Sequence, residues 1–392
     1  MSEAVIVAGA RTPVGKGGKG SFARVRPDDL AAHCVRETLK RAPGVDPADI
    51  GDFVLGCAMP EAEQGMNVAR MVGLAAQLPD EVPAFTVNRH CASGLQSISM
   101  ASDRVNLGDS DVVLAGGLES MSLIPMGGHK IAPNPELTHR RPESYMTMGL
   151  TAERVAEKYK ISREDQDAFA LRSHQRAVAA IQSGKFKDEI APFSWTETGL
   201  DEKHKEVSKT RILENDEGPR ADTSLEALKS LKAAFKVNGT VTAGNSSQVS
   251  DGAAVVLLTT RAYAEKKGLK PLARLLKFAV TGVAPEIMGI GPLYAIPMVL
   301  KKAGLTLSQI DLFELNEAFA AQSLAVVREL GLDENKVNVN GGAIALGHPL
   351  GCTGAKLTLT LIHELKRRGG RYGIVSLCVG GGMGAAGVFE II

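Results

Sequence analysis

The segment TVNRHCASGL, residues 86–95, reads as a short buried strand that passes a cysteine to the first turn of a helix. Residues 84–87 are apolar and partly β-branched, whereas the apolar residues from Leu95 to Val105 recur at helical spacing. We therefore predict that Cys91 lies near a helix N-terminus, where free N–H groups and the helix dipole favour the thiolate and lower the pKa. A single cysteine in such a place is also commonly an inert core residue, so this segment leaves both interpretations open.

The composition is typical of a globular protein with more than one domain. The chain has 392 residues, of which 44% are hydrophobic and 23% charged, so it can bury a large core. Its formal net charge of +1 predicts neither nucleic acid nor a membrane surface as a general partner. No apolar run approaches the roughly 20 residues needed to cross a bilayer, and the first residues lack the features of a secretory signal.

The cysteines form an odd and scattered set, without the spacing of metal ligands or of a disulfide framework. A reducing compartment is the simplest interpretation, so we expect a cytoplasmic protein without a bound metal. The five cysteines are Cys34, Cys57, Cys91, Cys352 and Cys378.

Strand and helix patterns alternate in the first and last thirds of the chain, which predicts an α/β fold with parallel strands covered by helices. Residues 118–248 are more polar and irregular, and we expect them to form an inserted subdomain. The expected helices are 30–39, 68–76, 293–300, 317–330 and 357–365. The expected strands are 5–8, 53–57, 84–87, 112–115 (ending at Gly116-Gly117), 275–280, 312–315, 337–339 and 374–378.

The second alternating region repeats the first, at a period too long for a solenoid, which predicts two similar α/β halves packed together. The matching segments are 86–88 with 337–340, 113–117 with 376–381, and 252–257 with 384–389. We expect an N-terminal half of residues 1–117 plus 249–270, an inserted subdomain of residues 118–248, and a C-terminal half of residues 271–392.

The clearest element of the insertion is a helix opened by Ser162, with Asp165 at the position of a capping-box partner, and closed near Gly184. Charged stretches of the insertion, such as DEKHK at 201–205, are typical of a solvated surface. The alternative is a surface that receives a polyanionic ligand.

Side chains able to do chemistry follow the ends of four expected strands, where ligands bind in open α/β sheets. They are Cys91, Asn316, His348 in the loop GGAIALGHP at 341–349, and Cys378. Two cysteines and a histidine can supply nucleophile, acid and base, and nearby glycines bring backbone N–H groups close to an oxyanion. A loop histidine is equally often an anchor, and a cysteine ending an apolar strand is usually core. The coincidence of all four favours a catalytic site. The run GGGMG at 380–384 lacks the crossover helix of a dinucleotide loop.

Motifs along essentially the whole chain resemble those of one known family, the thiolases, and are most similar to the degradative 3-ketoacyl-CoA thiolases (acetyl-CoA acyltransferases). They are GARTP at 9–13, NRHCASG at 88–94, GLESMS at 117–122, TAGNSS at 242–247, NEAF at 316–319, GHP at 347–349 and CVGGGMG at 378–384. The resemblance implies the thiolase fold, in which two similar α/β halves pack in α-β-α-β-α layers.

The resemblance also implies a role for each candidate residue. Cys91 would attack the 3-keto carbon of a 3-ketoacyl-CoA while His348 takes its thiol proton, leaving an acyl group on Cys91. Cys378 would protonate the acetyl-CoA enolate and then deprotonate a second CoA. One oxyanion hole would use His348 and a water held by Asn316, the other the backbone N–H groups of Cys91 and Gly380. No metal or permanently bound cofactor is implied; coenzyme A is a co-substrate.

Coenzyme A would bind the insertion, according to the same resemblance. Arg220 matches a family position near the adenine end, and Ser247 matches one that bonds the pantetheine. Ala227 departs from the pattern, since some relatives have a CoA-contacting serine there. The residues that would line the channel are Phe235, Ala243, Ala318 and Phe319, and those that would close over the acyl end are Met148 and Met288.

The expected assembly is a homodimer, because the segment between Gly117 and Met148 differs from the tetramer-forming loop of biosynthetic relatives; a tetramer is the alternative. The expected partners are acyl-CoA and CoA, with no nucleic acid and no membrane insertion. A multienzyme partner of fatty acid β-oxidation is left open.

Two rivals stand beside the degradative thiolase. A biosynthetic acetoacetyl-CoA thiolase (acetyl-CoA acetyltransferase) would differ in chain-length preference. A non-catalytic acyl-CoA or lipid carrier is disfavoured by the joint presence of Cys91, His348, Asn316 and Cys378. A decarboxylating ketoacyl synthase is also disfavoured, because a second cysteine suits reversible thiolysis.

Overall fold

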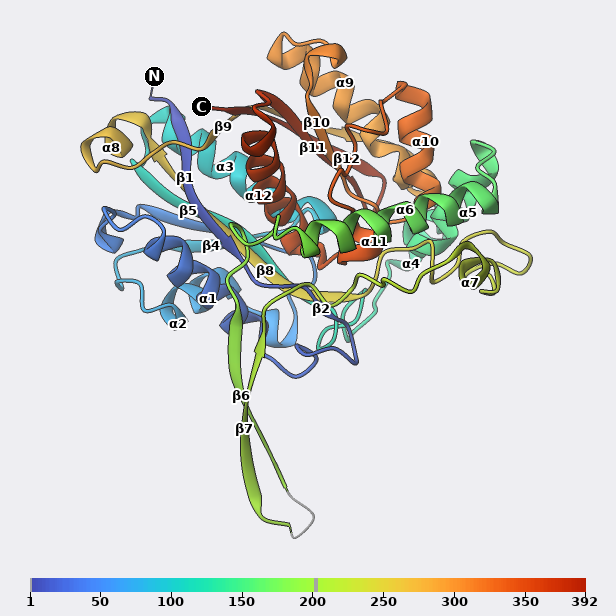
Figure 1. Ribbon diagram of the computed structural model, residues 1–392, viewed down its shortest axis with the longest axis horizontal. Helices are drawn as coiled ribbons and strands as arrows, with labels where there is room; N and C mark the ends of the chain where they lie inside the picture. Colours follow the sequence, from blue (N-terminus) through green and yellow to red (C-terminus); the bar gives the residue numbers. More distant parts are fainter. Residues whose placement is uncertain (1, 201–203) are drawn as a thin grey trace.

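A computed structural model describes residues 2–200 and 204–392, and its backbone is organised around one ten-stranded mixed sheet (Figure 1). The strand order is β10-β11-β12-β9-β1-β8-β5-β3-β4, with β2 paired to β8 at the side. These strands are β1 (Ala4–Arg11), β2 (Gly15–Lys16), β3 (Asp52–Cys57), β4 (Ala84–Val87), β5 (Val112–Ser120), β8 (Ser250–Thr260), β9 (Ala273–Gly282), β10 (Leu312–Leu315), β11 (Tyr372–Val379) and β12 (Met383–Ile391).

Helices cover both faces of this sheet. The α-helices are α1 (Pro27–Lys40), α2 (Val68–Ala75), α3 (Ser93–Leu107), α4 (Pro135–Arg140), α5 (Met148–Lys158), α6 (Arg163–Gln182), α7 (Leu225–Lys229), α8 (Arg261–Lys266), α9 (Gly291–Ala303), α10 (Ala320–Leu330), α11 (Ala343–Leu346) and α12 (Leu350–Arg368). Short 3₁₀ turns are η1 (Pro47–Asp49), η2 (Ala62–Gln64), η3 (His90–Ala92), η4 (Pro142–Tyr145), η5 (Pro285–Ile290) and η6 (Leu307–Gln309).

The strand order is mirrored about the contact between β1 and β9, which confirms the expectation of two similar halves. From this contact outward the N-terminal half runs β1-β8-β5-β3-β4 and the C-terminal half runs β9-β12-β11-β10. The directions also match, since β3 is parallel to β5 as β10 is to β11, while β8 and β12 are antiparallel to both of their neighbours.

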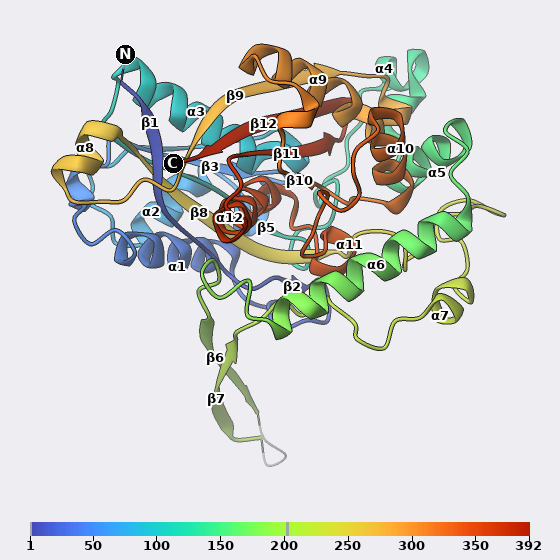
Figure 2. The ribbon, with the colours of Figure 1, turned by 45° about the horizontal axis from the view of Figure 1, so that its top comes forward.

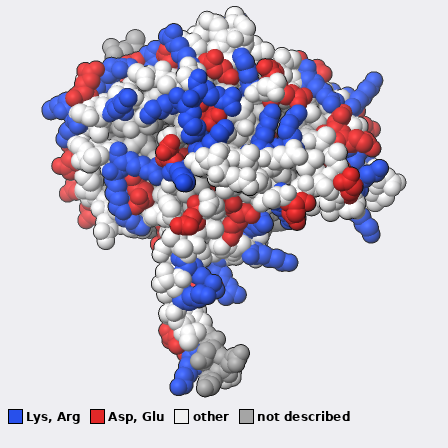
Figure 3. Space-filling view, viewed as in Figure 1, with Lys and Arg blue, Asp and Glu red and all other residues white. Residues whose placement is uncertain are grey.

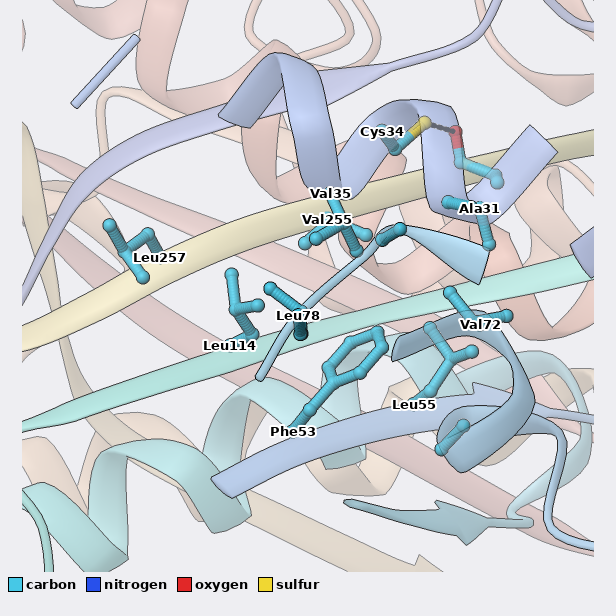
Figure 4. Packing of buried hydrophobic residues seen from close by; sticks show 14 of the residues in the cluster. Ala31, Cys34, Val35, Phe53, Leu55, Val72, Leu78, Leu114, Val255 and Leu257 are labelled. Carbon is cyan, nitrogen blue, oxygen red and sulfur yellow. Dashed lines mark hydrogen bonds between the residues drawn. The ribbon is translucent and has the colours of Figure 1, made fainter. Parts of the chain in front are cut away.

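Three apolar cores hold together the five layers that the resemblance implied, in which the two halves of the sheet form separate β layers and the second core covers both faces of the central helices. The first lies between α1 and α2 and the outer face of the N-terminal strands, and Figure 4 shows Val35 of α1 lying against Val255 of β8 there. The second contains α3 and α12 together with residues of both halves, such as Val113 and Leu377. The third lies between α9 and α10 and the C-terminal strands. Figure 2 shows α12 near the centre of the molecule, between the two sets of strands.

The prediction that a strand ends at Gly116-Gly117 was wrong, because β5 continues to Ser120. A Cβ on Gly116 would lie 2.2 Å from the carbonyl oxygen of Ala254 on β8, and one on Gly117 would lie 2.0 Å from that of Gly351 in α12. The two glycines therefore permit close packing of β5 against its neighbours rather than ending the strand.

The predicted strand 337–339 is reduced to a single bridge between Val337 and Phe313. Asn338 has a φ of +46°, which turns the chain away from the sheet. Its side-chain Oδ1 accepts from the N–H of Leu315 at 2.9 Å, and its Nδ2 donates to the carbonyl of Leu315 at 2.8 Å. The Asn338 side chain thus makes the hydrogen bonds to Leu315 that a strand backbone would make. In the N-terminal half, the corresponding pairing is between the backbones of β4 and β3.

The predicted helix 317–330 begins only at Ala320. Phe319 has an extended backbone, with φ −146° and ψ 148°, and pairs with Ser246. This extended stretch lies beside the TAGNSS segment at 242–247, where Ser247 donates its N–H to the carbonyl of Ala318 at 2.9 Å. The pairing connects the insertion to the strand end that carries Asn316.

The segment between β5 and β8 contains α4 to α7 and a hairpin of β6 (Phe193–Leu200) and β7 (Glu206–Leu213), which projects far from the body (Figures 1 and 2). The helix predicted from Ser162 is confirmed as α6, since the Ser162 hydroxyl accepts from the N–H of Asp165 at 3.0 Å.

Residues 201–203 of the charged run DEKHK lie outside the described residues. Figure 3 shows charges of both signs interspersed over one face. None of the helices described is long and apolar enough to cross a bilayer.

Candidate active site

Cys91 lies in the 3₁₀ turn η3, between the end of β4 and the start of α3. Asn88 Oδ1 accepts from the N–H of His90 at 2.8 Å, and Ser93 Oγ donates to the carbonyl of His90 at 2.7 Å. These bonds hold His90 at a φ of +43°, a conformation that is strained for a residue with a side chain. The turn places the Cys91 side chain, 7% exposed, against Ala58 and neighbouring apolar residues.

The prediction of a lowered pKa for Cys91 was wrong for the free protein. Burial raises the pKa of its thiol to about 11, although the backbone N–H groups of Gly380 and of Cys91 itself act in the opposite direction. Cys91 precedes α3 instead of lying in its first turn, so the helix dipole is a weaker influence than the apolar surroundings. A buried thiol of this kind needs a base to become a nucleophile.

His348 lies just before α12, with both ring nitrogens in contact with other side chains. Its Nε2 is 3.2 Å from Nδ2 of Asn316, and its Nδ1 is 2.6 Å from Oγ1 of Thr353. Burial, together with the charge of Lys356, lowers the pKa of His348 to about 3. The ring is therefore neutral at pH 7, which is the form able to accept a proton.

Asn316 follows β10 and is fixed through its backbone. Its N–H donates to the carbonyl of Ser376 at 2.9 Å, and its carbonyl accepts from Nε2 of Gln322 at 3.2 Å. Its side-chain Oδ1 is buried and has no hydrogen-bond partner among the described residues. An unpaired buried oxygen is costly, so this atom is a ready acceptor for a water or a substrate group.

Cys378 lies near the end of β11 and approaches Cys91 from the other half of the molecule. Burial raises the pKa of the Cys378 thiol, and the charge that Cys91 would carry raises it further. The next turn contains Gly380, where an added Cβ would lie 3.7 Å from Sδ of Met148 and 3.8 Å from the ring of His90. The structure therefore brings Cys378 and Gly380 to Cys91 and joins His348 to Asn316, and the two groups approach each other where α12 and β11 pack against η3.

A compact apolar cluster includes Cys378, two of the four residues predicted to line the channel and both methionines predicted to close over the acyl end. Met288, Ala318 and Phe319 are buried in it together with Cys378, and Met148 packs against it from the start of α5. The ring of Phe235 meets that of Phe319 edge-on, with centroids 6.0 Å apart. The side chains that the resemblance assigns to the acyl end thus form an apolar surrounding for Cys378.

Two family models together account for nearly the entire chain. Residues 4–262 match the model of the thiolase N-terminal domain, and residues 269–391 match that of the thiolase C-terminal domain. The chain belongs to the thiolase family. As a member, this thiolase is an acyltransferase.

Relatives of this thiolase are found in bacteria and eukaryotes. It is 62% identical over 391 residues to the 3-ketoacyl-CoA thiolase of Bacillus subtilis (strain 168), with 100% of both chains covered. It is 46% identical to 3-ketoacyl-CoA thiolase 5, peroxisomal, of Arabidopsis thaliana, covering 98% of this chain and 85% of the relative. Among solved structures, the Bacillus anthracis acetyl-CoA acetyltransferase is 45% identical, with a TM-score of 0.90 and coverage of 100% and 99%.

A surface pocket of about 350 Å³ is lined mainly by the segment between β5 and β8, together with Ile344 of α11. Arg220 and Ala243 line it, as does Ala227, the residue that departs from the family pattern. Arg220 is oriented through its backbone, since its N–H donates to Nδ1 of His174 at 3.2 Å. Ser247 is not among the lining residues and is instead bonded to Ala318 by its backbone.

Glu119 is a structural part of the thiolase site that the sequence reasoning missed. Its buried carboxylate accepts from the backbone N–H groups of Ala58, Met59 and Gly351, and from Nε2 of Gln64. It thus connects the wall beside Cys91 to the first turn of α12. The signal that could have identified it is a carboxylate inside an otherwise apolar strand.

No group of three histidine, cysteine, aspartate or glutamate side chains among the described residues is arranged to hold a metal ion. All five cysteines of the thiolase are free and buried.

Proposed function

We propose that this thiolase is a 3-ketoacyl-CoA thiolase, which cleaves a 3-ketoacyl-CoA with CoA to acetyl-CoA and an acyl-CoA shortened by two carbons, as in fatty acid β-oxidation. The observation that carries the proposal is the meeting of two cysteines from opposite halves beside a neutral histidine bonded to Asn316. Relatives with that name at 62% and 46% identity support the substrate class.

The first half of the reaction forms an acyl-enzyme. His348 takes the proton of the Cys91 thiol as the sulfur attacks the 3-keto carbon, because the raised pKa of Cys91 leaves little thiolate beforehand. The developing oxyanion is met by preorganised donors, for which the backbone N–H groups of Cys91 and Gly380 are the candidates. Cleavage of the carbon–carbon bond leaves the shortened acyl group on Cys91.

The second cysteine, Cys378, acts first as the acid that protonates the leaving enolate and then as the base for CoA. Cys378 remains a thiol because burial raises its pKa, so it can give a proton to the acetyl-CoA enolate. The resulting thiolate then takes the thiol proton of the incoming CoA, which attacks the acyl-enzyme and releases the product, and the departing Cys91 thiolate takes its proton back from His348. His348 and a water held by the unpartnered Oδ1 of Asn316 face the enolate oxygen. In this scheme the side chains supply nucleophile, acid and base, and the only small molecules required are acyl-CoA and CoA.

A substrate series tests this function. We expect CoA-dependent cleavage of acetoacetyl-CoA and also of 3-ketohexanoyl-, 3-ketodecanoyl- and 3-ketohexadecanoyl-CoA, because the apolar cluster at Cys378 can receive a longer chain. The measurement is acetyl-CoA production at equal enzyme concentration. Turnover of acetoacetyl-CoA alone would contradict the degradative assignment, and binding without any turnover would indicate an acyl-CoA carrier.

The biosynthetic acetoacetyl-CoA thiolase is the second candidate, favoured by one specific observation. The Bacillus anthracis structure with a TM-score of 0.90 is an acetyl-CoA acetyltransferase. The substrate series separates the two, since that reaction joins two acetyl units and needs no room for a long chain.

We infer that the CoA moiety occupies the 350 Å³ pocket, with Arg220 near its phosphates and adenine and with the pantetheine running past Ser247 toward Ala243, Ala318 and Phe319. Arg220→Ala is expected to raise the KM for CoA about tenfold with little change in kcat, because a charge-assisted bond contributes about 1.5 kcal/mol. Lys229→Ala, which removes a cation from nearby α7 outside the pocket lining, is the control. Equal KM values for the two variants would contradict this placement of the CoA moiety.

A homodimer is supported by the exposed edge of β4, which ends the sheet and whose residues are only half-buried. Light scattering distinguishes the homodimer from the tetramer and the monomer.

We also propose a cytoplasmic location, in keeping with five free thiols. The domains that we propose are an N-terminal half of residues 1–117 plus 249–270, an inserted subdomain of residues 118–248 and a C-terminal half of residues 271–392. A β-oxidation partner enzyme would be detected by co-purification.

A further inference from the structure

Thr353 contacts the candidate base His348 on the side away from Asn316, and the scheme above gives it no role. It lies in the first turn of α12 and is fully buried. Its Oγ1 is 2.6 Å from Nδ1 of His348, while Nε2 of the same ring is 3.2 Å from Nδ2 of Asn316. Since a neutral imidazole carries one hydrogen, these two contacts determine which nitrogen can act as a base.

The hydrogen of the Thr353 hydroxyl is engaged in a hydrogen bond within α12. Oγ1 donates to the carbonyl of Pro349, one helical turn back, at 2.8 Å. The hydroxyl can then only accept from His348, so the imidazole hydrogen belongs on Nδ1. The contact with Asn316 favours the same position for the hydrogen. Nδ2 of Asn316 is a donor that faces Nε2, so Nε2 must carry a lone pair and no hydrogen. Contacts on opposite sides of the ring therefore favour the same tautomer.

We propose that Thr353 is a positioning residue that holds His348 in the Nδ1–H tautomer. Nε2 then keeps its lone pair, which accepts from Nδ2 of Asn316 in the free protein and exchanges that bond for the thiol proton of Cys91. This inference rests on the proposed function of His348 as the base. In the opposite tautomer Nε2 already carries a hydrogen and cannot accept another, so the ring would have to release one proton before taking up the next.

Attack by Cys91 is balanced in protons and electrons when His348 starts as the Nδ1–H tautomer. The S–H bond of Cys91 breaks, a bond forms between that hydrogen and Nε2, and the sulfur electron pair forms the bond to the substrate carbonyl carbon. The π pair of the carbonyl moves to its oxygen. The imidazolium then has a hydrogen on each nitrogen, and the Nδ1–H remains bonded to Thr353. That acceptor also stabilises the positive ring, which lies at a helix N-terminus where a cation is otherwise disfavoured.

Thr358 provides a matched control on the same helix. It is fully buried, and its Oγ1 donates to the carbonyl of Gly354 one turn back at 2.8 Å, as Thr353 does to Pro349. Thr353→Val and Thr358→Val therefore each lose one buried hydroxyl–carbonyl bond. Only Thr353→Val also loses the acceptor for His348, whereas Thr353→Ser keeps it.

The experiment measures thiolysis kinetics and the His348 tautomer in the full-length protein. We expect Thr353→Val to lower kcat about 10²-fold, the size of a general-base contribution, with the KM for CoA little changed. Thr358→Val and Thr353→Ser should stay close to the parent protein. Nitrogen-15 spectra of histidine-labelled protein, with His348 identified by its loss in His348→Asn, should show Nδ1–H in the parent and a different tautomer population in Thr353→Val.

An Nε2–H tautomer in the parent protein would overturn the proposal, as would equal kcat values for Thr353→Val and Thr358→Val. If the parent protein cleaved no 3-ketoacyl-CoA, the proposed function would fail by itself. The tautomer would still be read from the spectra, so the two failures are distinguishable. A Thr353→Val variant that does not accumulate is replaced by Thr353→Ala, with Thr358→Ala beside it.

Discussion

Replacing Cys91 with serine is expected to abolish thiolysis, with a loss in kcat on the order of 10⁴-fold or more, the scale seen when a nucleophile that acts with its base is removed. The reason is that the acyl group is carried on this sulfur, and the serine hydroxyl is a much weaker acid for His348 to deprotonate and a poorer nucleophile. Incubation with acetyl-CoA followed by mass spectrometry of the intact protein should show one acetyl group on the parent chain and none on the variant.

Two further substitutions separate the roles of the thiols. Cys378→Ser should still become acetylated by acetyl-CoA, since Cys91 and His348 are unchanged, but should turn over slowly because the enolate lacks its acid. Cys34→Ser is the control for loss of a buried thiol, because a serine hydroxyl can keep the bond that Cys34 makes to the carbonyl of Ala253. Acetylation of Cys91→Ser at the parent level would exclude Cys91 as the nucleophile.

Replacing Arg11 with methionine is expected to destabilise the fold by about 3–5 kcal/mol, the cost of leaving buried charges without their partner. Arg11 is fully buried, with Nε 2.7 Å from Oε1 of Glu189 and Nη1 2.7 Å from Oδ1 of Asp216. Its Nη2 also donates to the other oxygen of Asp216 at 2.9 Å. The midpoint of urea unfolding, followed by circular dichroism, should fall accordingly.

A matched exposed pair provides the control for Arg11. Arg140 contacts Glu136 at 3.2 Å, with the two side chains 67% and 71% exposed, so Arg140→Met should cost no more than about 1 kcal/mol. Similar urea midpoints for the two variants would show that burial adds nothing to the Arg11 contacts. If Arg11→Met does not accumulate, Asp216→Asn tests the same contact while keeping the shape of the side chain.

Local patterns were sufficient for most elements of the sheet and for the α6 cap, because strand alternation and the Ser162 hydroxyl act within a few residues. They failed where a distant group decides the outcome. Gly116-Gly117 looked like a strand end, yet these glycines make room for Ala254 and Gly351, which are remote in sequence. Residues 337–339 looked like a strand, but the side chain of Asn338 takes over the pairing with Leu315.

The candidate catalytic residues could be named from their motifs, but their protonation states could not. A cysteine ahead of a helix predicts a lowered pKa, whereas burial raises the pKa of Cys91 to about 11. The shift depends on Ala58 and Leu350 closing around the thiol from other segments. Likewise, nothing in the order of residues indicated that Thr353 would meet Nδ1 of His348, since this requires the exact pitch of the first turn of α12.

The sequence by itself determined the two-halved α/β architecture, the family and the identity of Cys91, His348, Asn316 and Cys378, because those depend on periodicity and on motifs that are short in sequence. The tertiary structure alone decided how these groups behave. The two cysteines meet only because the halves pack about α3 and α12, and the burial this creates keeps both thiols protonated and His348 neutral. Burial and contact depend on the whole packed chain, so no local pattern contains them.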